Sequence, residues 1–354
     1  MRRQFRMRTS KNLLCPTIAL MLALPALTAL PALGQSEDVA RFYRGKTLKL
    51  VIPSTPGGDY DTRARLVARH LGRHIAGEPH ILPMNMPGGS GVTGANYLAG
   101  AAAPRDGTIL EILLQNMPVH QATGGQGTAF DVKNFGWIGN TSSSPNLISA
   151  WHTTGIRTIQ DAMSRELVIG APAATAGVIY PSAMNALAGT KFKIVTGYLS
   201  GTHVNLAIER GEVGGRGSNS WASWKATKPE WIKEGKLYHL VQVALKRDPE
   251  LANIPLMHEM AKNPEDEEVL RFLSADVAIS RAIVTTPGVP PARLLALRRA
   301  FDAMIADPAF LADAKKANID ISASTGEEAQ QVAASIVGAA PTVVARAKSI
   351  MEFK

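Results

Sequence analysis

The sequence contains almost no cysteine. Among its 354 residues there is a single one, Cys15, in an apolar segment near the N-terminus. One thiol cannot form an internal disulfide, so the fold has to be stable without cross-links. We expect the segment that carries Cys15 to be removed from the mature protein, which excludes redox and thiolate chemistry as well.

Basic runs interleaved with aromatic residues are also missing. The formal net charge of +9 comes from 38 lysines and arginines against 29 acidic residues, and aromatic residues make up 6% of the chain. Residues 1–34 contain five basic and no acidic residues, so the rest of the chain has a net charge of only +4. This balance argues against nucleic acid as a partner and is compatible with an anionic ligand.

Motifs for catalysis and metal binding are sparse. No GxSxG sequence is present, and no serine, histidine and acid form a recognisable local set. His70 and His74 are one helical turn apart, but Arg69 and Arg73 beside them would repel a metal cation. We therefore expect no catalytic residues, no metal site and no cofactor.

The N-terminal segment has the pattern of an export signal. Basic residues precede an apolar stretch over 13–30, and residues 32–34 supply the small side chains that a signal peptidase recognises. We predict cleavage before Gln35 and a periplasmic mature protein. A retained membrane anchor is the alternative, although prolines interrupt the apolar stretch. A twin-arginine match at residues 2–5 is too short to indicate the export pathway.

Residues 48–71 read as a strand, a tight turn and a helix. An apolar, β-branched run favours a buried strand, and the sequence PGG at 56–58 ends it. Asp59 or Asp61 can cap the helix, whose apolar residues recur at helical spacing. Free amide groups that lead into a helix N-terminus favour a carboxylate or phosphate. The alternative is a turn that needs glycine only because it is short.

Strand and helix patterns continue to alternate, which indicates a parallel sheet covered by helices. Ligands of such sheets bind beyond the carboxyl ends of the strands. The loops 54–61, 85–91 and 115–118, the last of which contains Asn116, are therefore expected at one rim.

A second unit of similar design is predicted to follow. Residues 167–170 open a strand, a loop and a helix much as residues 50–53 do. Extended segments at 137–152 and 276–286 are expected to cross between two lobes. The predicted organisation is a signal peptide over 1–34, a first lobe over 35–145 plus 277–354, and a second lobe over 146–276.

Residues 89–94 match the GxGxxG pattern of dinucleotide-binding folds, and Glu111 lies near the spacing of the ribose-binding acid. However, the apolar residues 112–114 follow Glu111, which places this acid inside a strand. An exported protein also lacks a ready supply of nicotinamide cofactor. An exported enzyme or nucleotide-binding protein that uses this segment is the alternative function.

Three blocks of the sequence resemble a known family. They contain the PGG turn at 56–58, the MPGG loop at 86–89 followed by the PRDG turn at 104–107, and the LAIERGEV block at 206–213. These blocks resemble the Bug-type (TctC-like) extracytoplasmic solute receptors of tripartite tricarboxylate transporters, and the resemblance runs from about residue 41 to the C-terminus.

The resemblance implies a periplasmic-binding-protein fold of type II, in which two α/β lobes joined by crossover strands enclose a ligand cleft. It also implies that a ligand carboxylate is held by loops of both lobes. Together with Asn116, the matching positions form the predicted ligand-binding set: Pro56, Gly57, Gly58, Tyr60, Asp61, Asn116, Ala174, Thr175, Ser200, Gly201, Arg216, Asn219, Ser220 and Trp221.

Two positions depart from the family pattern. Asp59 stands where the family often has a third glycine, and the loop over 172–177 lacks the usual glycines and serines. Asp59 either repels an anionic ligand or points away from it. Arg216 is expected to grip a carboxylate, with a surface salt bridge as the alternative.

The resemblance further implies a function and partners. The expected function is capture of a small organic acid by lobe closure and its delivery to integral-membrane transporter subunits, by a monomeric receptor. A ligand sensor without a role in transport is a further alternative.

Overall fold

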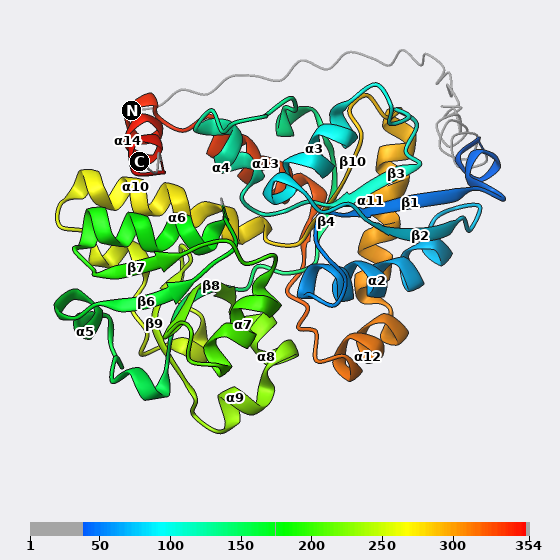
Figure 1. Cartoon of the computed structure of the whole chain (residues 1–354). Helices are drawn as coiled ribbons and strands as arrows, with labels where there is room; N and C mark the ends of the chain where they lie inside the picture. The colour runs from blue at the N-terminus through cyan, green and yellow to red at the C-terminus, as the bar shows by residue number, and fades with distance from the viewer. Residues whose placement is uncertain (1–37, 174, 352–354) are drawn as a thin grey trace, which may run out of the picture.

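The computed structural model describes residues 38–173 and 175–351, so the predicted signal peptide and Ala174 lie outside the described residues. Two mixed β-sheets, each covered by helices, form two lobes that lie side by side (Figure 1). The predicted α/β architecture of two lobes is confirmed. Within the described ranges, no helix combines the length and apolar character that crossing a membrane requires.

The first sheet has the strand order β11-β4-β10-β3-β1-β2. β1 pairs in parallel with β2 and β3, as the alternation of strands and helices predicts. β10 is antiparallel to β3 and β4 and brings a late segment of the chain into the middle of the sheet. The strands are β1 (Thr47–Ile52), β2 (His80–Asn85), β3 (Ile109–Ile112), β4 (Gly136–Asn140), β10 (Ala282–Thr285) and β11 (Ser324–Thr325).

The second sheet has the order β7-β6-β8-β5-β9. β6 pairs in parallel with β7 and β8, whereas β5 is antiparallel to β8 and β9. Both sheets thus combine a parallel group with antiparallel strands next to the crossovers. The strands are β5 (Asn146–Trp151), β6 (Leu167–Gly170), β7 (Phe192–Val195), β8 (Gly215–Ser220) and β9 (Leu237–Val243).

Helix α2 (Asp59–Leu71) shows how the sequence pattern becomes packing. Ala64, Val67 and Leu71, which recur at helical spacing, are buried where α2 covers β1 and β2. Burying each larger apolar side chain contributes about 1.5–3 kcal/mol. The helix ends at Leu71, and Ile75 is buried beyond a 3-10 turn over Gly72–His74.

The other helices fill the faces of both sheets (Figure 1). α13 packs on β4, whereas α14 packs on α6 and α10, so the two last helices contact different lobes. The bounds are α3 (Val92–Ala99), α4 (Met117–Ala122), α5 (Ile159–Ser164), α6 (Ala176–Ala183), α7 (Gly201–Glu209), α8 (Trp221–Thr227), α9 (Pro229–Lys233), α10 (Pro264–Ser274), α11 (Pro291–Ala306), α12 (Pro308–Lys316), α13 (Gly326–Val337) and α14 (Pro341–Met351).

The two crossovers between the sheets are hydrogen-bonded to each other. The chain leaves the first sheet after Asn140, and the Asn140 side chain accepts from the Arg281 amide at 3.0 Å. It also donates to the Ala278 carbonyl at 3.1 Å, and the Ser280 hydroxyl donates to the Ser142 carbonyl at 2.8 Å. These bonds fix the segment before β10, which carries Arg281, between the lobes.

A carboxyl group is buried without a partner in the core of the first sheet. Glu111 lies in β3, is fully buried, and neither carboxyl oxygen has a hydrogen-bond partner within the described residues. Burial raises the pKa of Glu111 to about 8, because a charged carboxylate is poorly solvated there. The side chain is therefore mostly neutral at pH 7.

This burial predicts a pH-dependent stability. Because the folded-state pKa of Glu111 lies above its unfolded value, its contribution is complete below about pH 4.5 and is lost as pH rises to about 8. Glu111→Gln is isosteric and does not ionise. We expect it to reduce the fall in unfolding free energy between pH 5 and pH 8 by roughly 3 kcal/mol.

Urea denaturation at the two pH values measures this difference. Glu166→Gln, on the surface, is the control for the loss of one glutamate. An unchanged pH slope in Glu111→Gln would contradict the assignment of a neutral, buried carboxyl.

Candidate functional site

A cavity of about 340 Å³ lies between the two lobes, and we call it the cleft. It is bounded by the segments that follow β1, β3 and β6, as expected for sheets of this kind. The first residues of α2 and α6–α8, or the residues that cap them, also reach its wall. The cleft is therefore rich in backbone amide groups that no helix hydrogen bond uses.

Ten of the fourteen residues predicted from the sequence line the cleft. They come from both lobes, so the structure brings together segments that are up to about 160 positions apart in the chain. These residues are Gly57, Gly58, Tyr60, Asn116, Thr175, Ser200, Gly201, Arg216, Asn219 and Ser220.

Pro56 and Trp221, which the sequence predicts as ligand contacts, lie outside the cleft lining. Pro56 is exposed. Trp221 begins α8 and packs edge-on against His239, with ring centroids 5.4 Å apart, while its indole donates to Glu250. The start of α8 therefore directs Trp221 toward β9 and away from the ligand space.

Asp61 is also outside the lining, because its carboxylate shapes the loop instead. It accepts hydrogen bonds from the Gly57 amide at 3.0 Å, from Arg65 at 3.0 Å and from Asn85 at 2.9 Å. Burial acts to raise the pKa of Asp61, but these hydrogen bonds outweigh it and lower the pKa below its usual value. Gly57 has φ of 85°, a left-handed conformation that glycine adopts readily.

The second-lobe wall is built from helix caps. Thr175 accepts from the Gly177 amide at the start of α6 and donates to the Pro172 carbonyl at 2.8 Å. Ser220 accepts from the Ser223 amide at 3.1 Å and caps α8. These bonds place the small hydroxyl residues at the wall.

Arg216 is a guanidinium without a counter-charge. It is half-buried on β8, and its Nε and Nη1 donate to the Ser218 carbonyl at 3.0 Å and to Asn205 Oδ1 at 2.9 Å. No carboxylate of the described residues lies within ion-pair distance of it, so the surface salt bridge considered above is not formed. Nη2 lies close to Gly201, at the start of α7.

The surroundings of Arg216 leave it charged at neutral pH. Burial lowers its pKa to about 10, and the charge of Asp59 partly offsets this effect. The guanidinium lies 5.3 Å from the centre of the Trp224 ring, which supports one face of it. A fixed cation with free N–H groups beside a helix N-terminus is suited to bind a carboxylate.

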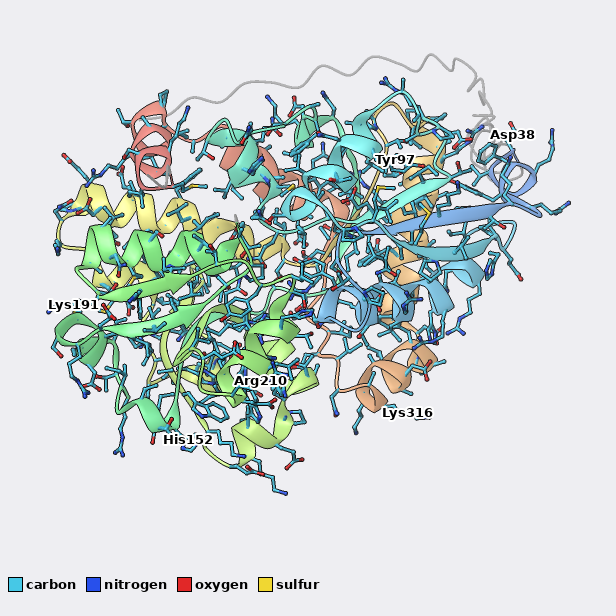
Figure 2. The ribbon with its side chains drawn as sticks, viewed as in Figure 1. Asp38, Tyr97, His152, Lys191, Arg210 and Lys316 are labelled. Atoms are coloured by element: carbon cyan, nitrogen blue, oxygen red, sulfur yellow. The ribbon has the colours of Figure 1, made fainter. Side chains whose placement is uncertain are left out.

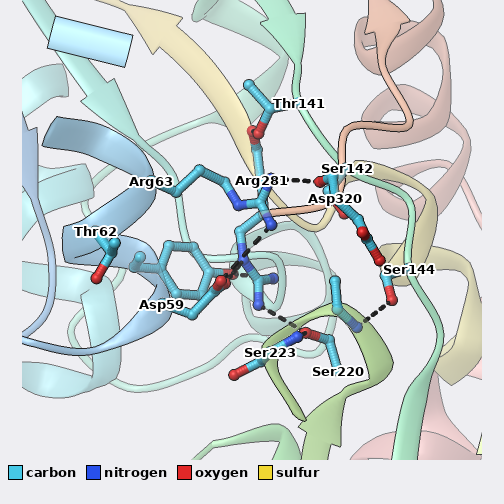
Figure 3. Close-up of polar contacts among 12 residues, drawn as sticks. Asp59, Thr62, Arg63, Thr141, Ser142, Ser144, Ser220, Ser223, Arg281 and Asp320 are labelled. Carbon is cyan, nitrogen blue, oxygen red and sulfur yellow. Dashed lines mark hydrogen bonds and ion pairs between the residues drawn. The ribbon is translucent and has the colours of Figure 1, made fainter. Parts of the chain in front are cut away.

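Asp59 pairs with an arginine that the sequence did not reveal. Its Oδ2 accepts from Arg281 Nε at 2.6 Å, and Arg63 Nη2 lies 3.6 Å from Oδ1 (Figure 3). Burial acts to raise the pKa of Asp59, but the charges of Arg281 and Arg63 dominate and lower it. Asp59 is therefore an anion, and its charge is balanced within the protein.

Arg281 links the two lobes through its other nitrogens. Nη1 donates to the Ser280 carbonyl at 2.7 Å, and Nη2 donates to Ser220 Oγ at 3.1 Å. The guanidinium also lies 4.1 Å from the centre of the Tyr60 ring. One signal could have identified Arg281: Asp59 at a glycine position needs a cation, and Arg281 is the one basic residue in the crossover 276–286.

The alternative motifs do not assemble into a site. Glu111 lies inside β3 and is fully buried, so it cannot reach a ribose at the rim of the sheet. His70 pairs with Asp313 at 2.8 Å and His74 with Asp307 at 3.0 Å. Within the described part of the chain, no three metal-ligating side chains are grouped around one point.

Solved structures share this fold at low sequence identity. No family model and no curated protein matches the sequence. A TctC solute-binding protein from Polaromonas aligns with a TM-score of 0.61 and 18% identity, over 87% of this chain and 98% of that one. The periplasmic binding protein BugD gives 0.67 and 16%, over 87% and 98%.

A third structure, MatC from Rhodopseudomonas palustris, contains malate. It aligns with a TM-score of 0.63 and 19% identity, over 87% of this chain and 99% of MatC. At these identities the alignments establish the architecture and leave the ligand open. The chain thus has the two-lobed fold of the periplasmic solute-binding proteins of the TctC and Bug type.

Proposed function

We propose that this protein is an extracytoplasmic solute receptor that captures a small, carboxylate-bearing organic ligand in the cleft. The observation that carries the proposal is Arg216, a cation on the cleft wall with no ion-pair partner within the described residues. Its remaining donors lie beside the N-terminus of α7, where the helix dipole also favours an anion. A ligand carboxylate would satisfy both.

The proteins with this fold support a carboxylate ligand. MatC was solved with malate. A second Rhodopseudomonas palustris protein, solved with adipate, aligns with a TM-score of 0.65 and 20% identity, over 86% of this chain and 97% of that one. Those ligands belong to those proteins, and for this chain they support the chemical class only.

Ligand capture would work by closure of two lobes, a first over residues 35–145 plus 277–354 and a second over 146–276. Contacts already join the lobes at opposite sides. Ser90 donates to the Ala173 carbonyl at 2.7 Å, and Lys225 pairs with Asp320 at 2.5 Å. A ligand that touches both walls stabilises this closed arrangement by its differential affinity for the two states.

The wider setting is part of the same proposal. Residues 1–34 would direct export and be removed, and the receptor would act in the periplasm as a monomer. Delivery to integral-membrane transporter subunits follows from the resemblance in the three sequence blocks. Pull-down of membrane proteins by the receptor, with and without the bound carboxylate, distinguishes this role from ligand sensing alone. Carboxylate-dependent capture of transporter subunits supports delivery, whereas capture of a sensor protein supports sensing.

Arg216→Gln removes the charge and keeps part of the hydrogen bonding. We expect carboxylate affinity to fall by about 10- to 100-fold, because hydrogen bonds to a charged partner contribute about 1.5–3 kcal/mol. The measurement is isothermal titration of the exported, processed protein, after a thermal-shift screen of mono-, di-, tri- and aromatic carboxylates and amino acids.

Arg210→Gln is the matched control. Arg210 is exposed at the end of α7 and lies outside the cleft lining (Figure 2). Equal affinity in the wild type and Arg216→Gln, with a normal unfolding transition in both, would contradict a carboxylate site at Arg216.

Gly201→Ala tests the same contact without altering a charge. A Cβ at Gly201 would lie 2.0 Å from Arg216 Nη2, the far end of a flexible side chain, so the guanidinium has to move. We expect weaker binding with little change in the unfolding midpoint. In the Arg216→Gln background the same substitution should have little further effect, because the two changes act on one interaction. Additive losses in the double variant would show that Gly201 acts independently of Arg216.

A further inference from the structure

The charged side chains that line the cleft can be counted. Within the described residues, they are Asp59, Arg216, Lys228 and Arg281. The unpaired charge that the cleft offers to a ligand depends on which of these four side chains form ion pairs within the protein.

Lys228 forms an ion pair with Glu209. Its ammonium lies 2.7 Å from Glu209 and 4.4 Å from the centre of the Trp231 ring. Both partners belong to the second lobe and lie outside the cleft lining. The charge of Lys228 is therefore balanced on the outer side of the wall.

Arg281 pairs with Asp59, and the buried Arg63, outside the lining, also lies 3.6 Å from the same carboxylate. The side chains of Arg281 and Asp59 are each 6% exposed, and their 2.6 Å contact is shielded from water, where an ion pair is stronger than at the surface. Arg281 Nη1 donates to the Ser280 carbonyl, and Nη2 donates to Ser220, a contact that Figure 3 shows. Because each of its nitrogens already has an acceptor, Arg281 offers a ligand few free donors.

Arg216 remains as the one lining cation without an acid in the described part of the chain. A ligand with one carboxylate would supply the acid that Arg216 lacks. A second carboxylate would lose its hydration without meeting an unpaired cation, which is costly in a partly buried site.

The rest of the wall suits neutral polar groups. On the first-lobe side, the lining residues Ser54, Gln115 and Asn116 carry a hydroxyl and two amides. On the second-lobe side, Asn219 Nδ2 is buried without a hydrogen-bond partner in the described residues, as is Ser54 Oγ. Buried polar groups of this kind favour a ligand that can hydrogen-bond with them.

We infer that Asp59 sets the charge preference of the cleft: by pairing with Arg281 it restricts the ligand to a small monocarboxylate whose remaining polar groups are uncharged. This inference rests on the proposed function and narrows its ligand class. Asp59 acts through Arg281 and is a specificity-determining residue rather than a contact of the carboxylate.

Matched ligands test the inference on the wild-type protein. Succinate, glutarate, adipate and terephthalate are each compared with the corresponding monoamide, which replaces one carboxylate by a neutral group of the same shape. Isothermal titration of the processed protein should show that the monoamide of any bound pair binds at least 10-fold more tightly. Among all carboxylates that bind in the wider screen, monocarboxylates should likewise bind more tightly than dicarboxylates.

Asp59→Asn tests the role of the ion pair. This isosteric change leaves Arg281 without its acid, and we expect the dicarboxylate to gain at least 10-fold relative to its monoamide. Asp38→Asn is the control for the loss of one aspartate, because Asp38 is exposed and lies outside the lining, and it should leave the ratio unchanged. Circular dichroism checks that each variant is folded. If Asp59→Asn fails to fold, the wild-type ratio alone decides.

The possible failures are distinguishable. Tighter binding of the dicarboxylate by the wild type, or an unchanged ratio in folded Asp59→Asn, overturns this inference. If that dicarboxylate binding is lost in Arg216→Gln, the proposed function still stands. If no carboxylate in either set binds, the proposed function fails, and the inference fails with it.

Discussion

The ion pair between Asp59 and Arg281 is the constraint on which the cleft depends. It joins the first residue of α2 to the crossover that precedes β10, at a point where both side chains are withdrawn from water. A buried charge with no partner costs several kcal/mol, so each residue requires the other. Because Arg281 also donates to Ser220, the pair fixes the first-lobe turn, the crossover and the start of α8 relative to one another.

Two arginines line the cleft, and their surroundings give them different roles. Arg281 meets a carboxylate, two hydroxyl-bearing residues and a backbone carbonyl, which together make it a structural link between the lobes. Arg216 donates to an amide oxygen and a carbonyl, and no acid of the described residues pairs with it. Under the proposed function, the same residue type supports the architecture in one place and recognition in the other.

Local patterns were sufficient to predict β1, α2 and the strand and helix that open the second unit, but residues 216–220, which the resemblance places in a loop, lie in β8. The turn at 56–58 and the loop around residue 200 line the cleft because strand ends in such sheets converge, whereas residues of β8 line it along the strand itself. Side-chain direction was harder to predict. Trp221 is buried against His239 of β9, and Asp61 turns into its own loop. Arg281 was missed because its partner is 222 positions away, and only the need of Asp59 for a cation pointed to it.

The central claim is that a ligand carboxylate lies against Arg216, between the two lobes. A crystal structure of the processed protein with a carboxylate found in the screen tests it most directly. The account predicts a carboxylate oxygen roughly 3 Å from Arg216 Nη2, with Asp59 still paired to Arg281. A carboxylate that displaces Asp59 from Arg281, or that binds outside the cleft, would contradict it.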